Sequence, residues 1–329
     1  MSVLVENMSE NVKTEDSLSD LLRKVSFGAT VFFRSEYCGH WAIDTSGSRQ
    51  VPFHLVSQGE GWLHSGAKTP ERLLAGHLVL FPNDSPHLLT ATMARPDKEV
   101  INRGPPARME GPVTRLICGY FLFDQRAAAP LLSSLPATMV LDLTDTPNST
   151  VRELAHLWMQ EAKERQLGSD IAIDRLAELV FIHMLRSEIA AGRITGLIGA
   201  LADARLGPIL ADIHRVPGAA HRLEYMAAAS NLSESAFAQR FKKQVGMTPG
   251  NYVRHWRMQT AARALRETER SMANIANSIG YNSEVAFRKA FRAFFDMAPG
   301  HYRRNSRSKT DAEFPLYGKS DQRRSRHSQ

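Results

Sequence analysis

A twenty-residue segment occurs twice in this chain, with an offset of fifty residues. The first copy, at 233–252, is SESAFAQRFKKQVGMTPGNY, and the second, at 283–302, is SEVAFRKAFRAFFDMAPGHY. Ser, Glu, Ala, both Phe, Met, Pro, Gly and Tyr occupy the same places in both. Self-similarity at a fixed period indicates one structural unit built more than once. The last third of the chain is therefore predicted to contain two copies of one small unit.

Each copy has the pattern of a capped amphipathic helix. Ser233 and Ser283 stand at the N-cap position, each followed by Glu. Two phenylalanines four residues apart lie on one side of each helix, and we expect them to form the core face together with Ala236 and Ala286. These phenylalanines are Phe237 and Phe241 in the first copy and Phe287 and Phe291 in the second. The opposite faces are polar and basic, with Val285 as the apolar exception.

A shorter helical pattern and a tight turn precede each copy. The first is LEYMAAASN, in which Asn231 suits a left-handed turn residue, and the second is SMANIANSIGY, in which Gly280 does. Helix, short turn and second helix with a polar outer face make a helix-turn-helix. One such match is a weak signal because helical hairpins are common, but two matches in register are a strong one.

The segment between the copies predicts a linking helix. PGNYVRHWRMQTAARALRET starts with Pro249, tolerated in a first helical turn, and carries an apolar stripe of Tyr252, Trp256, Ala261 and Leu265. A helix of about 18 residues is about 27 Å long. Successive major-groove faces of DNA are roughly 34 Å apart. One chain could therefore place two recognition helices in adjacent major grooves.

The charge distribution supports a nucleic-acid partner for the same region. Residues 221–329 carry 20 Lys and Arg against 9 Asp and Glu, whereas residues 1–220 carry 21 against 25. Phosphate attraction supplies most non-specific DNA affinity. A solvated basic face or an anionic membrane surface is the competing explanation.

The remainder of the chain predicts a β domain followed by helices. Short apolar runs broken by Gly, Pro, Asp and Asn extend from about residue 29 to 143, as in an antiparallel sandwich or barrel, with residues 94–112 as a long mobile surface loop. After Pro147 the pattern becomes helical, first behind a Ser149 cap and then from Ile173 to Met184. These two helices either pack within their domain or form a dimer seam.

Length and composition limit the broad class. The 329 residues suffice for two domains, and 43% apolar content is typical of a soluble protein. No apolar run reaches the roughly 20 residues of a membrane span, and the polar N-terminus is unlike a signal peptide, so we expect a cytoplasmic protein without a membrane partner. Cys38 and Cys118 are the sole cysteines, and the expected state in a reducing cytosol is two free thiols.

On these motifs, the last hundred or so residues resemble the DNA-binding domain of the AraC/XylS family of transcription regulators. The resemblance rests on MAAASNLSESAFAQRFKKQVGMTPGNYVRHWRM, ALRET and IANSIGYNSEVAFRKAFRAFFDMAPGHYRR. It implies base-facing positions at Ser235, Ala238, Gln239, Val285, Arg288 and Lys289. Phosphate contacts are expected from Lys242, Lys243, Arg254, Arg257, Arg292, Arg303 and Arg304. Asp296 departs from the pattern, which has Gly there as at Gly246, and Asp tolerates the left-handed conformation.

The β domain resembles a cupin in one motif. GHLVLFP at 76–82, followed by His87, is similar to the second cupin signature, whose histidine is a ligand in metal-binding cupins. The first signature is poor, with His54 but no His-x-His pair or clearly placed Glu. Two histidines under-supply a metal site, so no cofactor is assigned, although a metal completed by cysteine stays open. The alternative is that His54 and His87 hydrogen-bond within the barrel or line an organic-ligand pocket.

Cys38 in YCGHW and Cys118 in ICGYF each precede Gly in an apolar run. Free cysteine is often a small buried hydrophobe. The other interpretation is a redox switch, in which a thiolate becomes a sulfenic acid and then a disulfide, or a soft ligand site for a metal or an electrophile. The domain is similar to the sensor of an AraC-family subgroup in which cysteines at similar positions sense oxidants.

Together the patterns predict a multidomain α+β protein, a cupin-like β-barrel with flanking helices followed by an all-α double helix-turn-helix. The expected parts are a sensor at 1–147, a helical dimerisation and linker region at 148–215, the DNA-binding domain at 216–304 and a disordered basic tail at 305–329. The expected function is a non-enzymatic transcription regulator that senses a small molecule, metal or oxidant. Its expected partners are double-stranded promoter DNA, an unidentified effector, a second copy of the chain and, as a further candidate, RNA polymerase. The alternative is a metal-dependent cupin enzyme with a basic appendage.

Overall fold

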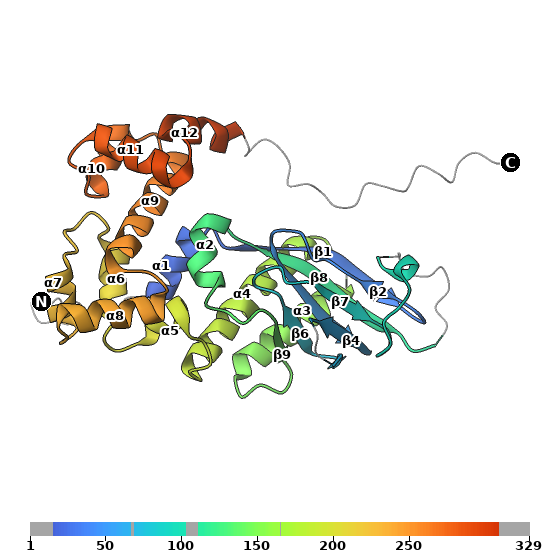
Figure 1. Cartoon of the computed structure of the whole chain (residues 1–329). Helices are drawn as coiled ribbons and strands as arrows, with labels where there is room; N and C mark the ends of the chain where they lie inside the picture. The colour runs from blue at the N-terminus through green and yellow to red at the C-terminus, as the bar shows by residue number, and fades with distance from the viewer. Residues whose placement is uncertain (1–15, 67–68, 103–110, 165, 309–329) are drawn as a thin grey trace, which may run out of the picture. The chain divides into compact units, whose positions relative to one another are not determined.

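The computed structural model describes residues 16–66, 69–102, 111–164 and 166–308 (Figure 1). The chain divides into two units, Met1–Pro208 with Gln239–Gly246 and Ile209–Ala238 with Met247–Gln329. Among the described residues, no helix has the length and apolar character needed to cross a bilayer.

The first unit contains two antiparallel sheets. Their strands are β1 (Gly28–Tyr37), β2 (Ala42–Ile43), β3 (Val51–Gln58), β4 (Glu60–Ser65), β5 (Glu71–Leu74), β6 (His77–Leu80), β7 (His87–Thr90), β8 (Thr114–Leu122) and β9 (Met139–Asp142). One sheet has the order β1-β8-β3-β6-β9 and the other β2-β7-β4-β5. This confirms the predicted antiparallel sandwich or barrel.

The interior between the sheets is filled by side chains from both. The cluster comprises Tyr37, Trp41, Ile43, Val56, Leu63, Leu73, Val79, Phe81, Leu89, Leu116 and Cys118. All of them are buried, because alternate residues of each strand point to the same face and here meet the opposite sheet. The β domain therefore has a packed core.

Helices cover the outer face of the five-stranded sheet. The helices of this unit are α1 (Ser17–Lys24), α2 (Gln125–Leu132), α3 (Ser149–Glu164), α4 (Ser169–Ala190) and α5 (Gly196–Ala202). Phe53 on β3 packs against Trp158 of α3 at 5.6 Å between ring centroids, and Phe121 on β8 against Phe181 of α4 at 4.6 Å. Strand β3 is therefore buried on both faces, which explains its nearly continuous apolar run.

Helix α4 also protects the edge strand β1. The Asp174 carboxylate accepts the N–H of Val31 at 2.7 Å and the Glu178 carboxylate accepts that of Ala29 at 3.2 Å. These bonds pair backbone groups that an open edge would leave unpaired.

Two predictions for this unit need correction or completion. The side chain that caps α3 is Asn148, whose Oδ1 accepts the Val151 N–H at 3.3 Å, and not Ser149. The described part of the predicted loop at 94–112 contains one short 3-10 helix, η2 (Lys98–Val100), whereas residues 103–110 lie outside the described residues.

The remaining helices are α6 (Gly207–Arg215), α7 (Leu223–Ala229), α8 (Glu234–Val245), α9 (Pro249–Glu267), α10 (Met272–Ser278), α11 (Glu284–Phe295) and α12 (Pro299–Ser308). Helix α9 is the predicted linking helix. It starts at Pro249 behind a Thr248 cap, and its predicted apolar stripe is buried. Helix α12 extends into the segment predicted to be a disordered tail, and residues 309–329 lie outside the described residues.

Candidate nucleic-acid interface and barrel site

The first helix-turn-helix consists of α7 and α8. Asn231 adopts the predicted left-handed conformation, with φ of 53°, and the Leu232 N–H donates to the Ala227 carbonyl at 3.0 Å to close the turn. Ser233 Oγ accepts the Ala236 N–H at 3.3 Å, which confirms the predicted cap.

The second helix-turn-helix, α10 and α11, repeats this geometry. Gly280 is the left-handed residue, with φ of 80°, and the Tyr281 N–H donates to the Ala276 carbonyl at 3.0 Å. Ser283 Oγ accepts the Ala286 N–H at 3.1 Å. Both units thus share the closing hydrogen bond of the turn and the serine cap. Their turns differ by one residue, since two residues lie between Gly280 and Ser283 and one lies between Asn231 and Ser233.

The predicted core face of the two helices is right for the phenylalanines and wrong for the alanines. All four phenylalanines, Phe237, Phe241, Phe287 and Phe291, are fully buried. Ala236 and Ala286 are exposed, because one residue step turns 100° around a helix and carries them away from the phenylalanine side.

The predicted base-facing residues lie on accessible surface. Ser235, Gln239, Arg288 and Lys289 are exposed, Ala238 is partly exposed, and Val285 keeps 77% of its surface accessible. Arg288 forms an ion pair with Glu284 one turn earlier, at 2.6 Å between Nη2 and Oε1. The predicted base-facing residues of α11 are therefore two cations and one apolar side chain.

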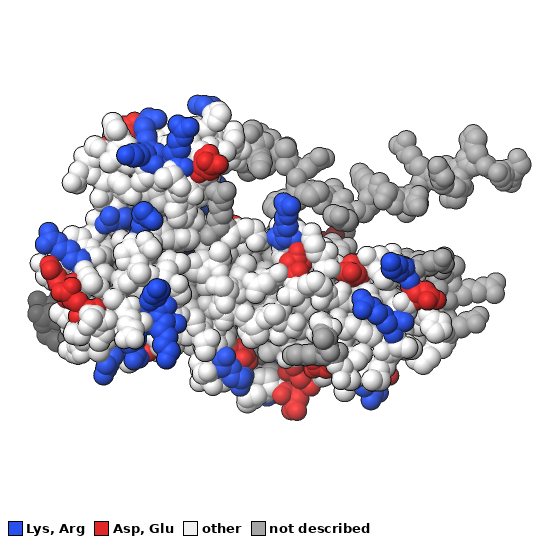
Figure 2. Space-filling view, viewed as in Figure 1, with Lys and Arg blue, Asp and Glu red and all other residues white. Residues whose placement is uncertain are grey.

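The predicted phosphate contacts separate into two groups. Lys242, Lys243, Arg254, Arg292 and Arg304 are exposed, and Figure 2 shows Lys and Arg side chains gathered over the region of α11. Arg257 and Arg303 instead donate to main-chain carbonyls, Arg257 to Pro217 and Ala219 at 2.7 and 2.8 Å and Arg303 to Arg270 at 2.6 Å. These two guanidinium groups therefore hold main-chain segments of the same chain in place.

Sequence reasoning gave no role to Arg240, which the structure ties to Asp203. Arg240 Nη2 lies 2.5 Å from Asp203 Oδ2, and Gln244 Nε2 donates to the same oxygen at 3.3 Å. Burial raises the pKa of Asp203, but hydrogen bonds from the Arg205 N–H, Arg240 and other donors outweigh it and lower the pKa to about 2. The only sequence signal is the spacing of Arg240 and Gln244, four residues apart on one side of α8.

Four side chains meet inside the β domain. His54 and Cys118 lie opposite each other on β3 and β8, with His54 Nδ1 2.9 Å from the Cys118 sulfur. His54 Nε2 lies 3.3 Å from His87 Nε2, and Thr45 Oγ1 lies 3.1 Å from the first and 2.9 Å from the second of these nitrogens. The structure thus joins Cys118, His54 and His87, whereas Cys38 is buried elsewhere on the chain, just after β1.

Both imidazoles are held neutral. Burial and the neighbouring His87 lower the pKa of His54, and burial lowers the pKa of His87. His87 Nδ1 is 2.7 Å from the Ser85 carbonyl and must donate to it, so Nε2 of neutral His87 is an acceptor. Burial raises the pKa of the Cys118 thiol, which is therefore protonated at neutral pH.

The donor set does not make a protein metal site. Cys118 meets His54 at Nδ1, on the opposite side of the ring from the point where the two Nε2 atoms converge. A closed tetrahedral site takes four ligands and a catalytic zinc site three. In the part of the chain that the structure describes, no three His, Cys, Asp or Glu side chains are placed to hold a metal ion.

Two helix-turn-helix units on one chain, joined by a helix and preceded by a β domain with its own core, define a DNA-binding transcription regulator. Comparison with known proteins agrees. Residues 16–190 match the family model for cupins, and residues 226–305 match that for a helix-turn-helix domain.

Curated proteins similar to this chain are also named as regulators. An AraC-like transcription regulator of Streptomyces lividans is 32% identical over 75% of this chain and 84% of its own length. An HTH-type transcriptional regulator of Haemophilus influenzae is 29% identical over 82% of this chain and 92% of its own. Among solved structures, the DNA-binding domain of AdpA in complex with a target DNA is 25% identical, over 34% of this chain and all of that one, with a TM-score of 0.32.

The chain belongs to the AraC family of transcription regulators, with an N-terminal cupin domain and a C-terminal double helix-turn-helix. This confirms the predicted family, the fold class and the non-enzymatic assignment.

Proposed function

We propose that the double helix-turn-helix recognises a promoter sequence and that the cupin domain controls this binding. The observation that carries the proposal is the exposure of the outer faces of α8 and α11 above fully buried phenylalanines. Ser235, Gln239, Arg288 and Lys289 hydrogen-bond base edges, while Ala238 and Val285 contact thymine methyl groups. Lys242, Lys243, Arg254, Arg292 and Arg304 neutralise phosphates, a set from which we leave out Arg257 and Arg303.

Duplex binding by the purified full chain tests this proposal. We expect affinity that falls steeply with salt and differs between sequences, because phosphates supply the first dependence and base edges the second. An affinity that changes neither with salt concentration nor with duplex sequence would contradict the proposed DNA recognition.

The controlling event in this proposal is oxidation at Cys118. The sandwich interior is filled by its apolar cluster, so a small oxidant suits it better than a bulky organic effector. A peroxide transfers one oxygen to the thiol, giving a sulfenic acid and water. At rest the proton stays on the thiol, because burial raises the pKa of Cys118 and lowers that of His54. The oxygen transfer therefore requires the thiol proton to move, as the peroxide reacts, to His54 Nδ1, which lies 2.9 Å from the sulfur.

Variants of the full chain distinguish the effectors. After hydrogen peroxide treatment we expect promoter affinity to change in the parent and in Cys38→Ser, and to stay constant in Cys118→Ser. A Cys118→Ser protein that responds like the parent ends the oxidant proposal. A response to a divalent metal that His87→Gln abolishes would replace it with a metal-controlled one.

The same proposal includes a dimer formed through α3 and α4. Large apolar side chains are exposed along this helical hairpin, namely Leu157, Leu167, Ile171 and Leu179. Ile171 and Leu179 lie two turns apart on one side of α4. A second copy covering this side would bury them and present four helix-turn-helix units to paired DNA sites, with RNA polymerase as a further partner.

A further inference from the structure

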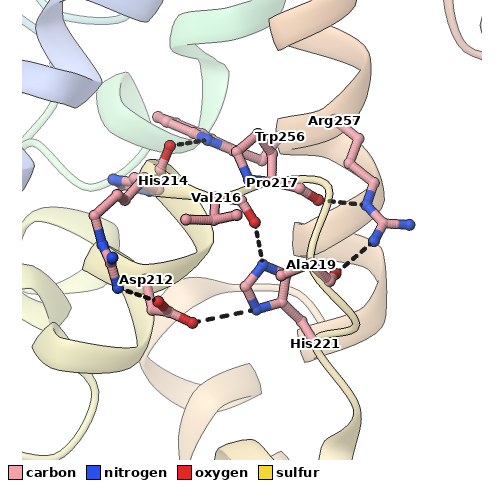
Figure 3. A network of polar contacts seen from close by, with 9 residues as sticks. Asp212, His214, Val216, Pro217, Ala219, His221, Trp256 and Arg257 are labelled. Carbon is pink, nitrogen blue, oxygen red and sulfur yellow. Dashed lines mark hydrogen bonds and ion pairs between the residues drawn. The ribbon is translucent and has the colours of Figure 1, made fainter. Parts of the chain in front are cut away.

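The loop between α6 and α7 is anchored to the linking helix α9. At the end of α6, the His214 ring stacks on Trp256 at 3.6 Å between centroids, and its Nε2 lies 2.7 Å from the Tyr252 hydroxyl. Trp256 Nε1 donates to the His214 carbonyl at 3.3 Å (Figure 3). All three residues are buried. The start of the loop is therefore fixed on α9.

Arg257, the next residue of α9, holds the middle of the loop. Its Nε donates to the Pro217 carbonyl at 2.7 Å and its Nη2 to the Ala219 carbonyl at 2.8 Å (Figure 3). The loop is also closed on itself, since His221 Nε2 donates to the Val216 carbonyl at 2.8 Å. The planar guanidinium offers several donors in fixed directions, which an ammonium group does not.

The other side of the same loop lies against the turn of the second helix-turn-helix. A Cβ on Gly218 would stand 2.7 Å from the Ser278 carbonyl oxygen, and a Cβ on Gly280 would stand 2.5 Å from the Gly218 oxygen. The two backbones are thus in direct contact, at a distance that only glycine permits on both sides.

We propose that Arg257 is a positioning residue for DNA recognition, which locks the loop leading into the first helix-turn-helix against the turn of the second, so that the two units read DNA at one spacing. The proposal rests on the DNA-binding function. DNA makes one turn in about 34 Å and about 10 base pairs, so one inserted base pair moves a subsite by about 3.4 Å and about 35° around the duplex. A chain locked in this way cannot adjust to a subsite that is displaced by this amount.

Spacing tolerance of the full-length chain is the decisive measurement. Duplexes selected from a random-sequence library supply the probe, and point substitutions locate the two subsites within it. A second probe carries one extra base pair between them. We expect the parent to bind the second probe about tenfold more weakly, a difference of about 1.4 kcal/mol. For Arg257→Ala we expect weaker binding to both probes. Its affinities for the two probes should differ by no more than about threefold.

Three further variants separate positioning from charge and from folding. Arg254→Ala removes an exposed arginine of the same helix, and we expect it to weaken both probes equally. Arg257→Lys keeps the charge but cannot donate to both the Pro217 and Ala219 carbonyls. It should therefore bring the affinities for the two probes within about threefold of each other, as Arg257→Ala does. Gly218→Ala pushes the loop away from the Ser278 carbonyl with an added methyl group and leaves Arg257 in place. It should also bring the two affinities within about threefold, so it tests the proposal if Arg257→Ala does not fold.

The outcomes are distinguishable. An Arg257→Ala or Gly218→Ala chain that keeps the parental tenfold ratio overturns the positioning role, even if both probes bind more weakly. A parent chain from which no preferred duplex can be selected overturns DNA recognition itself.

Discussion

At the residue scale, Gln239 and Lys289 are the most instructive pair. They occupy the same position in the two copies of the repeat, and both are exposed. The glutamine amide can donate and accept at one adenine edge, whereas the lysine is a point charge that bonds guanine or phosphate with less discrimination. The two helix-turn-helix units therefore differ in how much sequence they read.

We expect Gln239→Ala to lower the preference for the selected duplex over single-base variants of it by about 1–3 kcal/mol at one position. Lys289→Ala should weaken binding to all duplexes more evenly. Competition binding of both variants against the same panel of duplexes measures the difference. Equal loss of discrimination by the two variants would show that α11 reads as much sequence as α8.

At the element scale, the two recognition helices end differently. Asp296 closes α11 in the left-handed region with φ of 57°, and Gly246 follows α8 with φ of 85°. A side chain at such a residue is strained, and a carboxylate at a helix C-terminus also opposes the helix dipole.

We expect Asp296→Gly to raise the free energy of unfolding by about 0.5–1 kcal/mol and Gly246→Ala to lower it by about 1 kcal/mol. Urea unfolding of the full-length variants, followed by helical circular dichroism, measures both. A destabilising Asp296→Gly would mean that the carboxylate makes a compensating contact.

The helices and turns of the double helix-turn-helix could be predicted because each is determined by residues close in sequence, whereas α1, α2 and α5 were not predicted. Asn231 and Gly280 marked the turns, Ser233 and Ser283 the caps, and the Phe pairs the buried sides. The bonds of Arg257 and Arg240 could not be predicted, since their partners are about forty residues away with no periodicity to link them. For the same reason the meeting of His54, His87 and Cys118 was foreseen only as a set of candidates, and its geometry came from strand register.

At the scale of the whole molecule, the proposed dimer makes the DNA-binding unit a pair of chains. Leu179→Asp places a charge on the exposed side of α4 and should shift the chain to monomer in sedimentation velocity, with cooperative binding to paired sites lost. Leu74→Asp on β5 is the matched control, because both leucines are 43% exposed. A Leu179→Asp chain that sediments as the parent does would remove α4 from the interface.

Val285 has a consequence for chemically modified DNA. Its side chain is apolar, and 77% of its surface is open, so in the proposed complex it touches the methyl group on C5 of thymine. 5-Methylcytosine carries a methyl group on the same ring carbon and presents it in the same groove. A valine at this position does not distinguish the two methyl groups. Methylation of a cytosine beneath α11 would thus strengthen contact with this regulator.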